Sequence, residues 1–545
     1  MTKALILTLA CMSALPAFCA APSIAAQGVK NAASYADPQL PNGPIAQGSI
    51  FNIFGSNMGP TTIAYATSLP LPTTLSGTSV NVTVSGTTVQ CFMIYTLAGQ
   101  VAAILPSNTP VGTGTITVSY NGTASVTAPI TVAKSSFGIF TINQQGSLQA
   151  VIQDSNYQFN SATFAFQPGE TVVLWGTGLG PITGSDATTP PTGNLPGINV
   201  SVTVGGVAAT VTYAGRSGYS GDDQVAFTIP SGVTGCNVPL SVAVTTGATP
   251  VFSNWVTMAI GTTTTCSSPT GYPPGFQTAL GSGSVRVGSV ILLHSTSTFT
   301  FLGTTTVTTT DAGSAGFNKI SSNVYSTTGY DLNYGACVIT NTPPPGTVTS
   351  TGLDAGPVIN VNGTNGAKQV AVTPGYPGSF YATLGGGVPL PGQTAQPLYF
   401  NPGTYTVNNG SGGKDVGGFN FNITVPPAFT WTNYGSINAV PRSQALTVNW
   451  TGGDPSWDVY LFGGSSVADN AIVTFECRAH DSDQTLTVPV SILQALPVSA
   501  TTSGTPLGSL SMIVEPSTPS FPSVTGLDLF TAGYTIEYSK SVPFQ

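Results

Sequence analysis

The sequence predicts an all-β protein built from tandem β-sandwiches, and three observations lead to this prediction. Short runs rich in Val, Thr, Ile and Tyr alternate apolar with polar residues and are separated by Gly, Pro and Asn. These turn residues recur about every 8–12 residues, which is typical of sandwiches. No amphipathic helical pattern of useful length follows the N-terminal segment. A long internal repeat also runs through the first half of the chain.

The repeat predicts two sandwiches of the same design, one after the other. The strand-like run 80–84 (VNVTV) recurs at 200–204 (VSVTV), an offset of 120 residues. Gln100 recurs as Gln224, an offset of 124 residues. Differences in loop length within one fold produce such a small drift, so we expect two homologous sandwiches.

Beyond the repeat the chain stays rich in strand signals. Residues 267–345 have weaker turn signals and end at a Pro-Pro-Pro-Gly linker, and Gly-rich loops separate the strands that follow. The predicted divisions are a signal peptide at 1–26, sandwiches at 28–134 and 135–266, β-rich regions at 267–345 and 346–435, and a sandwich-like C-terminal domain at 436–545. Whether residues 267–430 form one domain or two stays open.

The N-terminus has the layout of a secretory signal peptide. Lys3 precedes an apolar run at 4–15, and small residues follow around Ala20 and Ala25. The run is shorter than the ~20 residues of a membrane helix. We therefore expect export, cleavage between Ala20 and Gln27, an extracellular or cell-surface location and no membrane span in the mature chain; a retained anchor is the alternative.

Five cysteines remain after the predicted cleavage, and oxidising conditions outside the cell favour their pairing. Cys236 and Cys266 bracket one candidate hairpin, so we expect a disulfide between them. Cys337 and Cys477 are a second candidate pair without support from the local pattern. Cys91 lies in an apolar strand-like run and is expected to be a buried free thiol.

Seven short motifs in the first half of the chain carry a resemblance to a known family. They are 31–35 (NAASY), 54–57 (FGSN), 70–72 (PLP), 99–101 (GQV), 137–140 (FGIF), 175–181 (WGTGLGP) and 235–239 (GCNVP). Together they resemble the Solibacter-type uncharacterised C-terminal domain family of secreted acidobacterial proteins, which is similar to the Ig-like IPT/TIG fold. The resemblance covers about residues 28–266 and implies export and Ig-like sandwiches. It implies no catalytic residue, because the family has no assigned activity.

The charge composition argues against several functions. Eleven Lys and Arg residues against 19 Asp and Glu give a formal net charge of −8, and only 6% of residues are charged. Eleven cations cannot form the basic surface that tracks phosphates, so we expect no nucleic-acid partner. Residues 38–133 contain no Asp, Glu, Lys, Arg or His. General acid–base catalysis needs such groups, so we expect no enzymatic activity there.

No complete catalytic or metal-binding motif occurs elsewhere. Ser411 and Lys414 spell S-x-x-K, but in a Gly-rich loop rather than at a helix start. Asp481 and Asp483 form a D-x-D pair that lacks the remaining oxygen ligands of a calcium loop, and a solvated hairpin tip is the favoured interpretation. We therefore expect no metal, no cofactor and no enzymatic activity.

One loop of the second sandwich gathers side chains that could bind a ligand. It contains Tyr213, Arg216, Tyr219, Asp222 and Asp223. Such a set could hold a sugar or a polar peptide, and the favoured alternative is a solvated loop in which Arg216 neutralises an aspartate.

These features favour a secreted or cell-surface structural or adhesion protein whose modules bind polysaccharide, matrix or cell-surface proteins. The competing hypothesis is a carbohydrate-active enzyme or accessory module with its site in residues 267–545. A glycosidase needs two carboxylates about 5–10 Å apart. The candidates are Asp454, Asp458, Glu476, Asp481 and Asp483.

Overall fold

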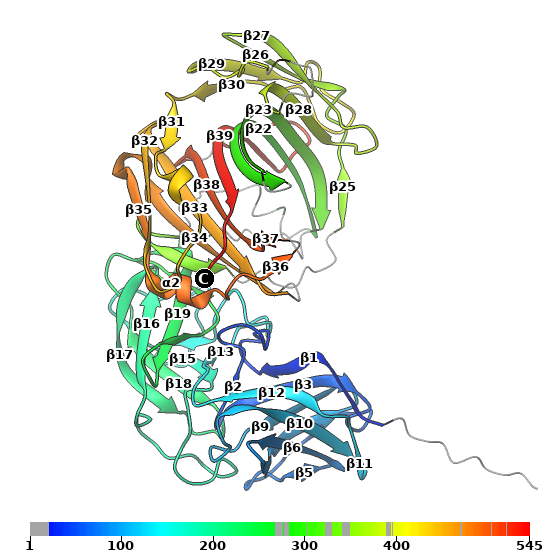
Figure 1. Ribbon diagram of the computed structural model, residues 1–545, viewed down its shortest axis with the longest axis vertical. Helices are drawn as coiled ribbons and strands as arrows, with labels where there is room; N and C mark the ends of the chain where they lie inside the picture. The colour runs from blue at the N-terminus through cyan, green and yellow to red at the C-terminus, as the bar shows by residue number, and fades with distance from the viewer. Residues whose placement is uncertain are drawn as a thin grey trace, which may run out of the picture.

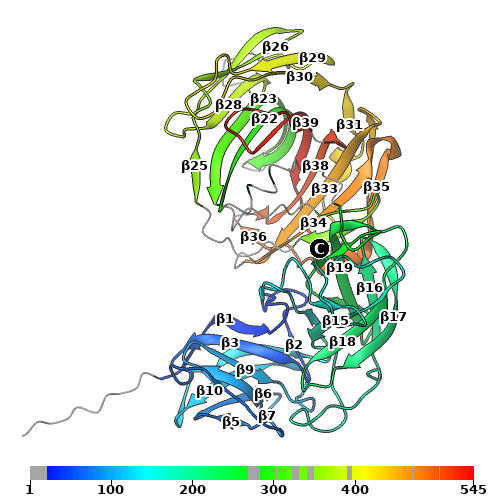
Figure 2. The same ribbon diagram turned by 180° about the vertical axis from the view of Figure 1, so that it is seen from behind.

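The chain folds into three lobes that follow one another in an arc (Figures 1 and 2). The computed structural model describes residues 21–267, 276, 279, 283–301, 304–321, 330–340, 349–388, 394, 396–468, 471–502, 504–518 and 520–545. Strands dominate all three lobes, so the all-β prediction is confirmed. The signal-peptide segment lies mostly outside the described residues. Among the helices that the structure describes, none has the length and apolar character needed to span a membrane.

The first lobe, sandwich 1, packs two sheets around one core. In β6 every second residue is buried, from Thr78 through Val80 and Val82 to Val84, as expected for a strand with one face on a core. One sheet holds β1 (Ser23–Asn31), β3 (Ile50–Ser56), β4 (Ala64–Tyr65), β8 (Phe92–Leu97) and β9 (Gln100–Ile104). The other holds β2 (Ile45–Ala46), β5 (Thr74–Leu75), β6 (Thr78–Val84), β7 (Thr87–Gln90), β10 (Gly112–Tyr120), β11 (Thr123–Ala124) and β12 (Ala128–Ala133).

In the second lobe, sandwich 2, one strand belongs to both β-sheet layers and connects them. The first half of β17 pairs with β16 and its second half pairs with β18, with a bulge between Val211 and Tyr213. A bulge bends a strand, which lets β17 pass from one layer to the other. The strands are β13 (Gly138–Ile139), β14 (Ile152–Gln153), β15 (Thr171–Thr177), β16 (Asn199–Val204), β17 (Val207–Arg216), β18 (Asp223–Thr228), β19 (Gly235–Thr245), β20 (Val251–Phe252) and β21 (Val256–Ile260).

The third lobe is built on one large sheet, with two smaller sheets packed against it. The large sheet holds β22 (Ser284–Phe301), β23 (Thr304–Ser321), β24 (Cys337–Thr340), β25 (Ser350–Gly352), β28 (Ser379–Gly386), β33 (Trp457–Ser466), β34 (Ile472–His480), β38 (Gly508–Pro516) and β39 (Leu529–Ser541). The smaller sheets hold β26 (Val358–Gly363), β27 (Gly366–Ala371), β29 (Gly403–Asn408) and β30 (Asn420–Val425), and β31 (Phe429–Trp431), β32 (Leu446–Gly452) and β35 (Thr485–Val488). The remaining elements are η1 (Tyr434–Ser436), η2 (Asp481–Asp483), α2 (Val490–Ala495), β36 (Thr501–Thr502) and β37 (Thr505–Pro506).

The large sheet does not follow the predicted division at 267–345, 346–435 and 436–545. The first long strand, β22, pairs in parallel with β39, the last strand of the chain, and β24 pairs with β34. One continuous core also contains Val290, Tyr405 and Val514, one residue from each predicted region. The three regions therefore share one sheet and one core, because both the parallel pair β22–β39 and the antiparallel pair β24–β34 join segments that are distant in sequence.

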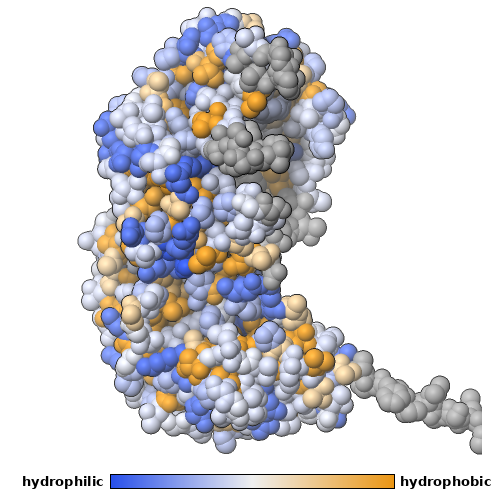
Figure 3. Space-filling model, viewed as in Figure 1, coloured by the Kyte–Doolittle hydropathy of each residue, from blue (hydrophilic) through white to orange (hydrophobic). Residues whose placement is uncertain are grey.

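The surface of the visible face is mostly close to neutral in hydropathy, with small hydrophilic and hydrophobic groups scattered over all lobes (Figure 3). This distribution agrees with a chain in which 6% of residues are charged. Hydroxyl, amide and backbone groups therefore form most of the polar surface.

Candidate functional site

A cleft with a volume of about 570 Å³ opens between the two tandem sandwiches. Sandwich 1 contributes residues of β3, β8 and β9, and sandwich 2 contributes residues next to β13, β14 and β18 and one on β15. Five aromatic rings line the cleft: Tyr35, Tyr95, Phe140, Phe159 and Trp175. Cavities of this size with aromatic walls and a few polar groups, placed between domains, are typical of ligand sites.

The floor of the cleft is a row of three residues on neighbouring strands of sandwich 1. Ala102 on β9 lies opposite Asn52 on β3 and opposite Tyr95 on β8. Because the alanine in the middle is small, the Tyr95 hydroxyl reaches across it and donates to Oδ1 of Asn52, at 3.2 Å. Gln100 donates to the same hydroxyl at 2.6 Å, and Asn52 donates to the hydroxyl of Tyr35 at 3.4 Å. The polar groups of the floor are thus fixed in place before any ligand arrives.

The wall from sandwich 2 is aromatic and partly open to solvent. Trp175 donates its indole N–H to Oε1 of Gln153 at 3.0 Å, which fixes the orientation of the ring. Phe159 is 52% exposed although it is a large apolar residue. Both rings line the cleft, so each offers an apolar face on which a ligand can stack.

Ionisable groups in the cleft are held in neutral forms at mildly acidic pH. Burial raises the pKa of Tyr95 to about 12 and raises that of Tyr35, so both phenols stay protonated. Burial also raises the pKa of Asp222 to about 7; Ser217, which donates to this carboxylate at 2.8 Å, opposes the shift. Below about pH 7 the described lining therefore carries no net charge.

A buried ion pair fixes the two sandwiches relative to each other. Arg216 and Asp223 lie opposite each other on β17 and β18, both side chains are fully buried, and an Nη1–Oδ1 contact joins them. The other Nη group of Arg216 donates to the carbonyl of Gly48 in sandwich 1 at 3.1 Å and to that of Gly180 at 2.8 Å. The Arg216 guanidinium is therefore the centre of an inter-domain latch.

Further contacts complete the same interface. Ser107 of sandwich 1 donates its hydroxyl and its backbone N–H to the carboxylate of Asp186, at 2.8 and 2.6 Å. Gly221 has φ +73° and approaches Ile50 and Ile104 so closely that an added Cβ would lie 2.8 and 3.0 Å from their side chains. Glycine is thus required where the loop of sandwich 2 meets sandwich 1.

The favoured alternative for the predicted binding loop is confirmed in one respect, because Arg216 pairs with an aspartate, Asp223. Its other part is wrong: both side chains are buried in the latch, so the pair is not solvated, and neither residue lines the cleft. Tyr213 donates its hydroxyl to the carbonyl of Arg216 at 2.5 Å, whereas Tyr219 is 71% exposed. Of the five residues, Asp222 alone lines the cleft. The sequence showed the charged residues together, but it did not show that an opposing domain covers them.

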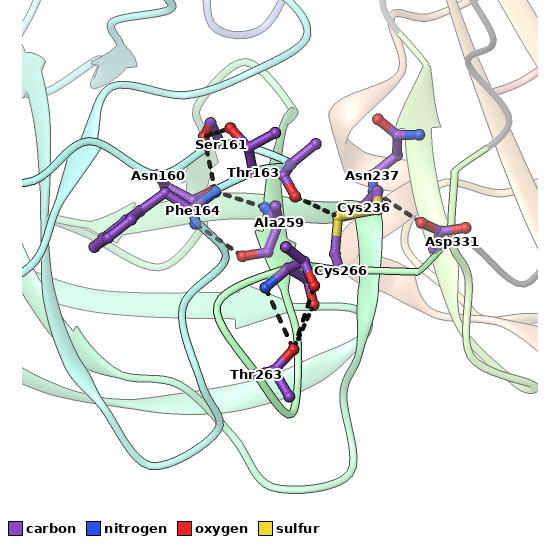
Figure 4. Close-up of a disulfide and its surroundings, with 12 residues drawn as sticks. Asn160, Ser161, Thr163, Phe164, Cys236, Asn237, Ala259, Thr263, Cys266 and Asp331 are labelled. Atoms are coloured by element: carbon purple, nitrogen blue, oxygen red, sulfur yellow. Dashed lines mark hydrogen bonds between the residues drawn. A yellow bond between two sulfur atoms is a disulfide. The ribbon is translucent and has the colours of Figure 1, made fainter. Parts of the chain in front are cut away.

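The disulfides agree with the cysteine analysis and extend it. Cys236 and Cys266 are joined, as predicted, at the edge of sandwich 2 that faces the third lobe (Figure 4). Next to this bond Asn237 donates its backbone N–H to Asp331 of the third lobe, at 2.8 Å. Cys337 and Cys477 are also joined, on the paired strands β24 and β34. Cys91 is a buried free thiol.

Three of the five carboxylates of the competing enzyme hypothesis have hydrogen-bond donors, whereas both side-chain oxygens of the buried Asp481 lack a partner in the described part of the chain. Asp458 accepts two bonds from Arg478, at 2.9 and 2.6 Å, and a third from Ser517. The side chain of Asp483 accepts from the backbone of His480, and Asp454 accepts from Ser456.

The pKa values of two carboxyls of that set are raised by their surroundings. Burial raises the pKa of Glu476 to about 7 and that of Asp481 to about 6. Within the described ranges no group of three His, Cys, Asp or Glu side chains is arranged to hold a metal ion. Ser411 and Lys414 lie in the loop between β29 and β30, away from any helix start.

Sequence reasoning missed the residues of the cleft itself. Tyr35 and Trp175 belong to two of the motifs that carry the family resemblance, and this was the available signal. Asn52 and Tyr95 gave none, because the contact between them depends on strand register.

Comparisons with known proteins leave the chain without an assigned family. It matches no family model and no protein of curated function. Among solved structures it is similar to domains A168-A170 from titin, with 9% identity and a TM-score of 0.14, covering 72% of this chain and 94% of that one. It is also similar to domains 4-9 of surface layer protein SbsC, with 12% identity and a TM-score of 0.13, covering 96% of this chain and 82% of that one. Likenesses at these scores carry no argument about function.

Proposed function

We propose that the protein is an exported, cell-surface or extracellular binding protein whose inter-sandwich cleft takes a segment of neutral polysaccharide. The observation that carries the proposal is the pairing of aromatic walls with an ordered floor of amide and hydroxyl groups. Sugar rings present apolar C–H faces that pack on aromatic rings, and hydroxyls that pair with amides and phenols. The signal-like N-terminus and two disulfides support an oxidising, extracellular environment.

The composition of the cleft favours a neutral sugar over an anionic one. Asp222 is the only carboxylate among the described lining residues, and none of these residues is a Lys, Arg or His. An anionic sugar would find no cation there and would meet a carboxylate above about pH 7. Recognition must therefore rest on stacking and uncharged hydrogen bonds.

The test is a binding screen with the full mature chain at pH 6. Cellulose, xylan, mannan and dextran serve as neutral probes, and alginate serves as the anionic probe. We expect a neutral polysaccharide to be retained and alginate to pass. Binding only to alginate, or to no probe, would contradict the proposal.

Two variants locate the binding in the cleft. Phe159→Ala removes an exposed ring of the wall, and Asn52→Ala removes the acceptor of the Tyr95 hydroxyl. Each should weaken binding about 10-fold, which is the range for loss of one stacking or hydrogen-bonding anchor. Tyr376→Ala is the matched control, because Tyr376 is 68% exposed on the third lobe and does not line the cleft. Equal affinity of all three variants would exclude the cleft as the site.

A further inference from the structure

The aromatic residues that the tandem sandwiches expose to solvent belong to elements that form or adjoin the inter-sandwich cleft. Within residues 21–267 the exposed aromatic residues are Tyr65, Tyr157, Phe159 and Tyr219. Phe159 lines the cleft itself, and Tyr219 lies in the loop that leads to the lining residue Asp222. Single exposed apolar groups are common and need no explanation, but several of them around one cavity mark a binding surface.

Tyr65 extends the floor of the cleft by one strand. It lies on β4, the edge strand of its sheet, directly opposite Tyr95 on β8. One row across four neighbouring strands therefore consists of Asn52, Ala102, Tyr95 and Tyr65. Residues opposite each other on paired antiparallel strands share a face of the sheet, so Tyr65 lies on the face that forms the floor.

The row continues past the end of the cleft. The ring centroids of Tyr65 and Tyr95 are 5.9 Å apart, but Tyr65 does not line the cleft and is 57% exposed. Three steps between neighbouring strands separate Asn52 from Tyr65, and at ~4.8 Å per step the row is ~14 Å long. A row of this length exceeds a single sugar ring, so it suits several linked sugar units.

Tyr157 presents a second exposed ring, from sandwich 2. It is 78% exposed, and its backbone has φ +63°. A bulky side chain rarely adopts this left-handed conformation, and residues with such strain are concentrated at functional sites. A tyrosine that is strained and yet exposed gains little from packing, which favours a role in contact with a ligand.

Hydrogen bonds hold the loop of Tyr157 against the aromatic wall of the cleft. The carboxylate of Asp154 accepts two backbone N–H groups of this loop, at 2.9 and 2.8 Å. Gln153 donates its side-chain amide to the carbonyl of Tyr157 at 3.2 Å and accepts the indole N–H of Trp175 at 3.0 Å. One amide therefore connects the backbone of the exposed tyrosine with a ring that lines the cleft.

We propose that the ligand is a polysaccharide chain longer than the cleft, and that it continues over Tyr65 on sandwich 1 and Tyr157 on sandwich 2. This inference rests on the proposed function and adds the length of the ligand to it. Each exposed ring packs on the C–H face of a further sugar unit. Affinity then grows with chain length, whereas a site confined to the cleft is already filled by a short oligosaccharide.

The test compares a disaccharide with a hexasaccharide of each neutral probe, by calorimetric titration of the full mature chain at pH 6. The pairs are cellobiose with cellohexaose, xylobiose with xylohexaose, mannobiose with mannohexaose, and isomaltose with isomaltohexaose. We expect one hexasaccharide to bind about 10-fold more tightly than its disaccharide, or more. Equal affinity of the two lengths would overturn the longer site and leave the proposed function standing. Absence of binding by every hexasaccharide would overturn both.

Two variants test the exposed rings. Tyr65→Ala and Tyr157→Asn should each weaken hexasaccharide binding about 5-fold and leave disaccharide binding unchanged, because only the longer ligand reaches these rings. Asn tolerates the left-handed backbone, so Tyr157→Asn should keep or raise the thermal midpoint. A lower midpoint with unchanged hexasaccharide affinity would mean that Tyr157 serves the fold and would overturn its role in binding.

Two further variants serve as controls. Tyr381→Ala is matched to Tyr65→Ala, because Tyr381 is also 57% exposed and lies on a strand, β28 of the third lobe; it should change neither affinity. Phe159→Ala removes a ring of the cleft itself and should weaken both lengths. If Phe159→Ala weakens hexasaccharide binding while Tyr65→Ala and Tyr157→Asn leave it unchanged, the longer site is overturned and the cleft remains.

Discussion

The inter-domain latch gives the sharpest stability prediction. Arg216→Met keeps the length of the side chain and removes its charge. Asp223 then stays fully buried without its cation, and the carbonyls of Gly48 and Gly180 lose their donor. Removing one partner of a buried ion pair costs about 3–5 kcal/mol, because the remaining charge is uncompensated.

Two features of the latch set the value within that range. Asp223 keeps the backbone N–H groups of Gly178 and Leu179, at 2.7 and 2.8 Å, which stabilise its charge. Each lost bond to a carbonyl adds about 1 kcal/mol. The two effects oppose each other, so we expect the unfolding free energy of the tandem sandwiches to fall by about 4 kcal/mol.

Urea denaturation followed by tryptophan fluorescence measures this change. Lys134→Met is the matched control, because Lys134 is exposed and donates only one long bond, to Gly197 at 3.4 Å; it should change stability by less than about 0.5 kcal/mol. The double variant Arg216→Met/Asp223→Asn should recover part of the loss, because no charge is then left unpaired. A loss below about 1 kcal/mol for Arg216→Met, or no recovery in the double variant, would refute the latch.

Four further predictions rest on the buried carboxyls, the two disulfides, the first strand and the cleft. Burial raises the pKa of Asp222 and Glu476 to about 7 and that of Asp481 to about 6, so the folded chain binds more protons than the unfolded chain above about pH 4. Stability should therefore fall as the pH rises from 5 to 8, and a urea midpoint that rises over this range would contradict this. Replacing Cys337 and Cys477 with Ser should destabilise the chain by about 5 kcal/mol, against about 3–4 kcal/mol for Cys236 and Cys266, because the closed loops span 140 and 30 residues; denaturation of both variants measures the order. Secreted material should begin at or before Ser23, because β1 begins there and pairs with β3, and N-terminal peptide mass spectrometry would expose a later start. Binding of a neutral polysaccharide should persist in EDTA, and its loss would reveal a cation site.

Local sequence patterns predicted those parts of the fold that depend on residues close together along the chain. Alternating runs predicted strands such as β6 and β16 because one face of each lies on a core. The bracketing of a hairpin predicted the Cys236–Cys266 bond for a similar reason: β19 and β21 pair between these cysteines, so the partners are close along the chain.

The pairing of strands that are distant along the chain could not be predicted from local patterns. β22 and β39 pair in parallel although more than two hundred residues separate them along the chain. The residue pattern of neither strand indicates which strand is its partner. The Cys337–Cys477 bond depends on the pairing of β24 with β34, so the local sequence did not indicate it, for the same reason. The cleft floor needs a register across three strands before Asn52 and Tyr95 become neighbours.

The placement of the charges links these findings. The chain has few cations, and the structure uses several of them inside: Arg216 is fully buried, the side chain of Arg478 is 14% exposed, and Lys540 donates to the carbonyl of Tyr434 from a buried position. Charge in this protein therefore fixes lobes and sheets, while in the proposed function the cleft recognises its ligand through uncharged groups. Salt separates the two uses, because ions screen charges but hardly affect stacking on aromatic rings. Polysaccharide binding in the cleft should therefore stay constant from 0.05 to 0.5 M NaCl. A strong salt dependence in the cleft would mean that a charged group, and not the aromatic wall, dominates recognition there.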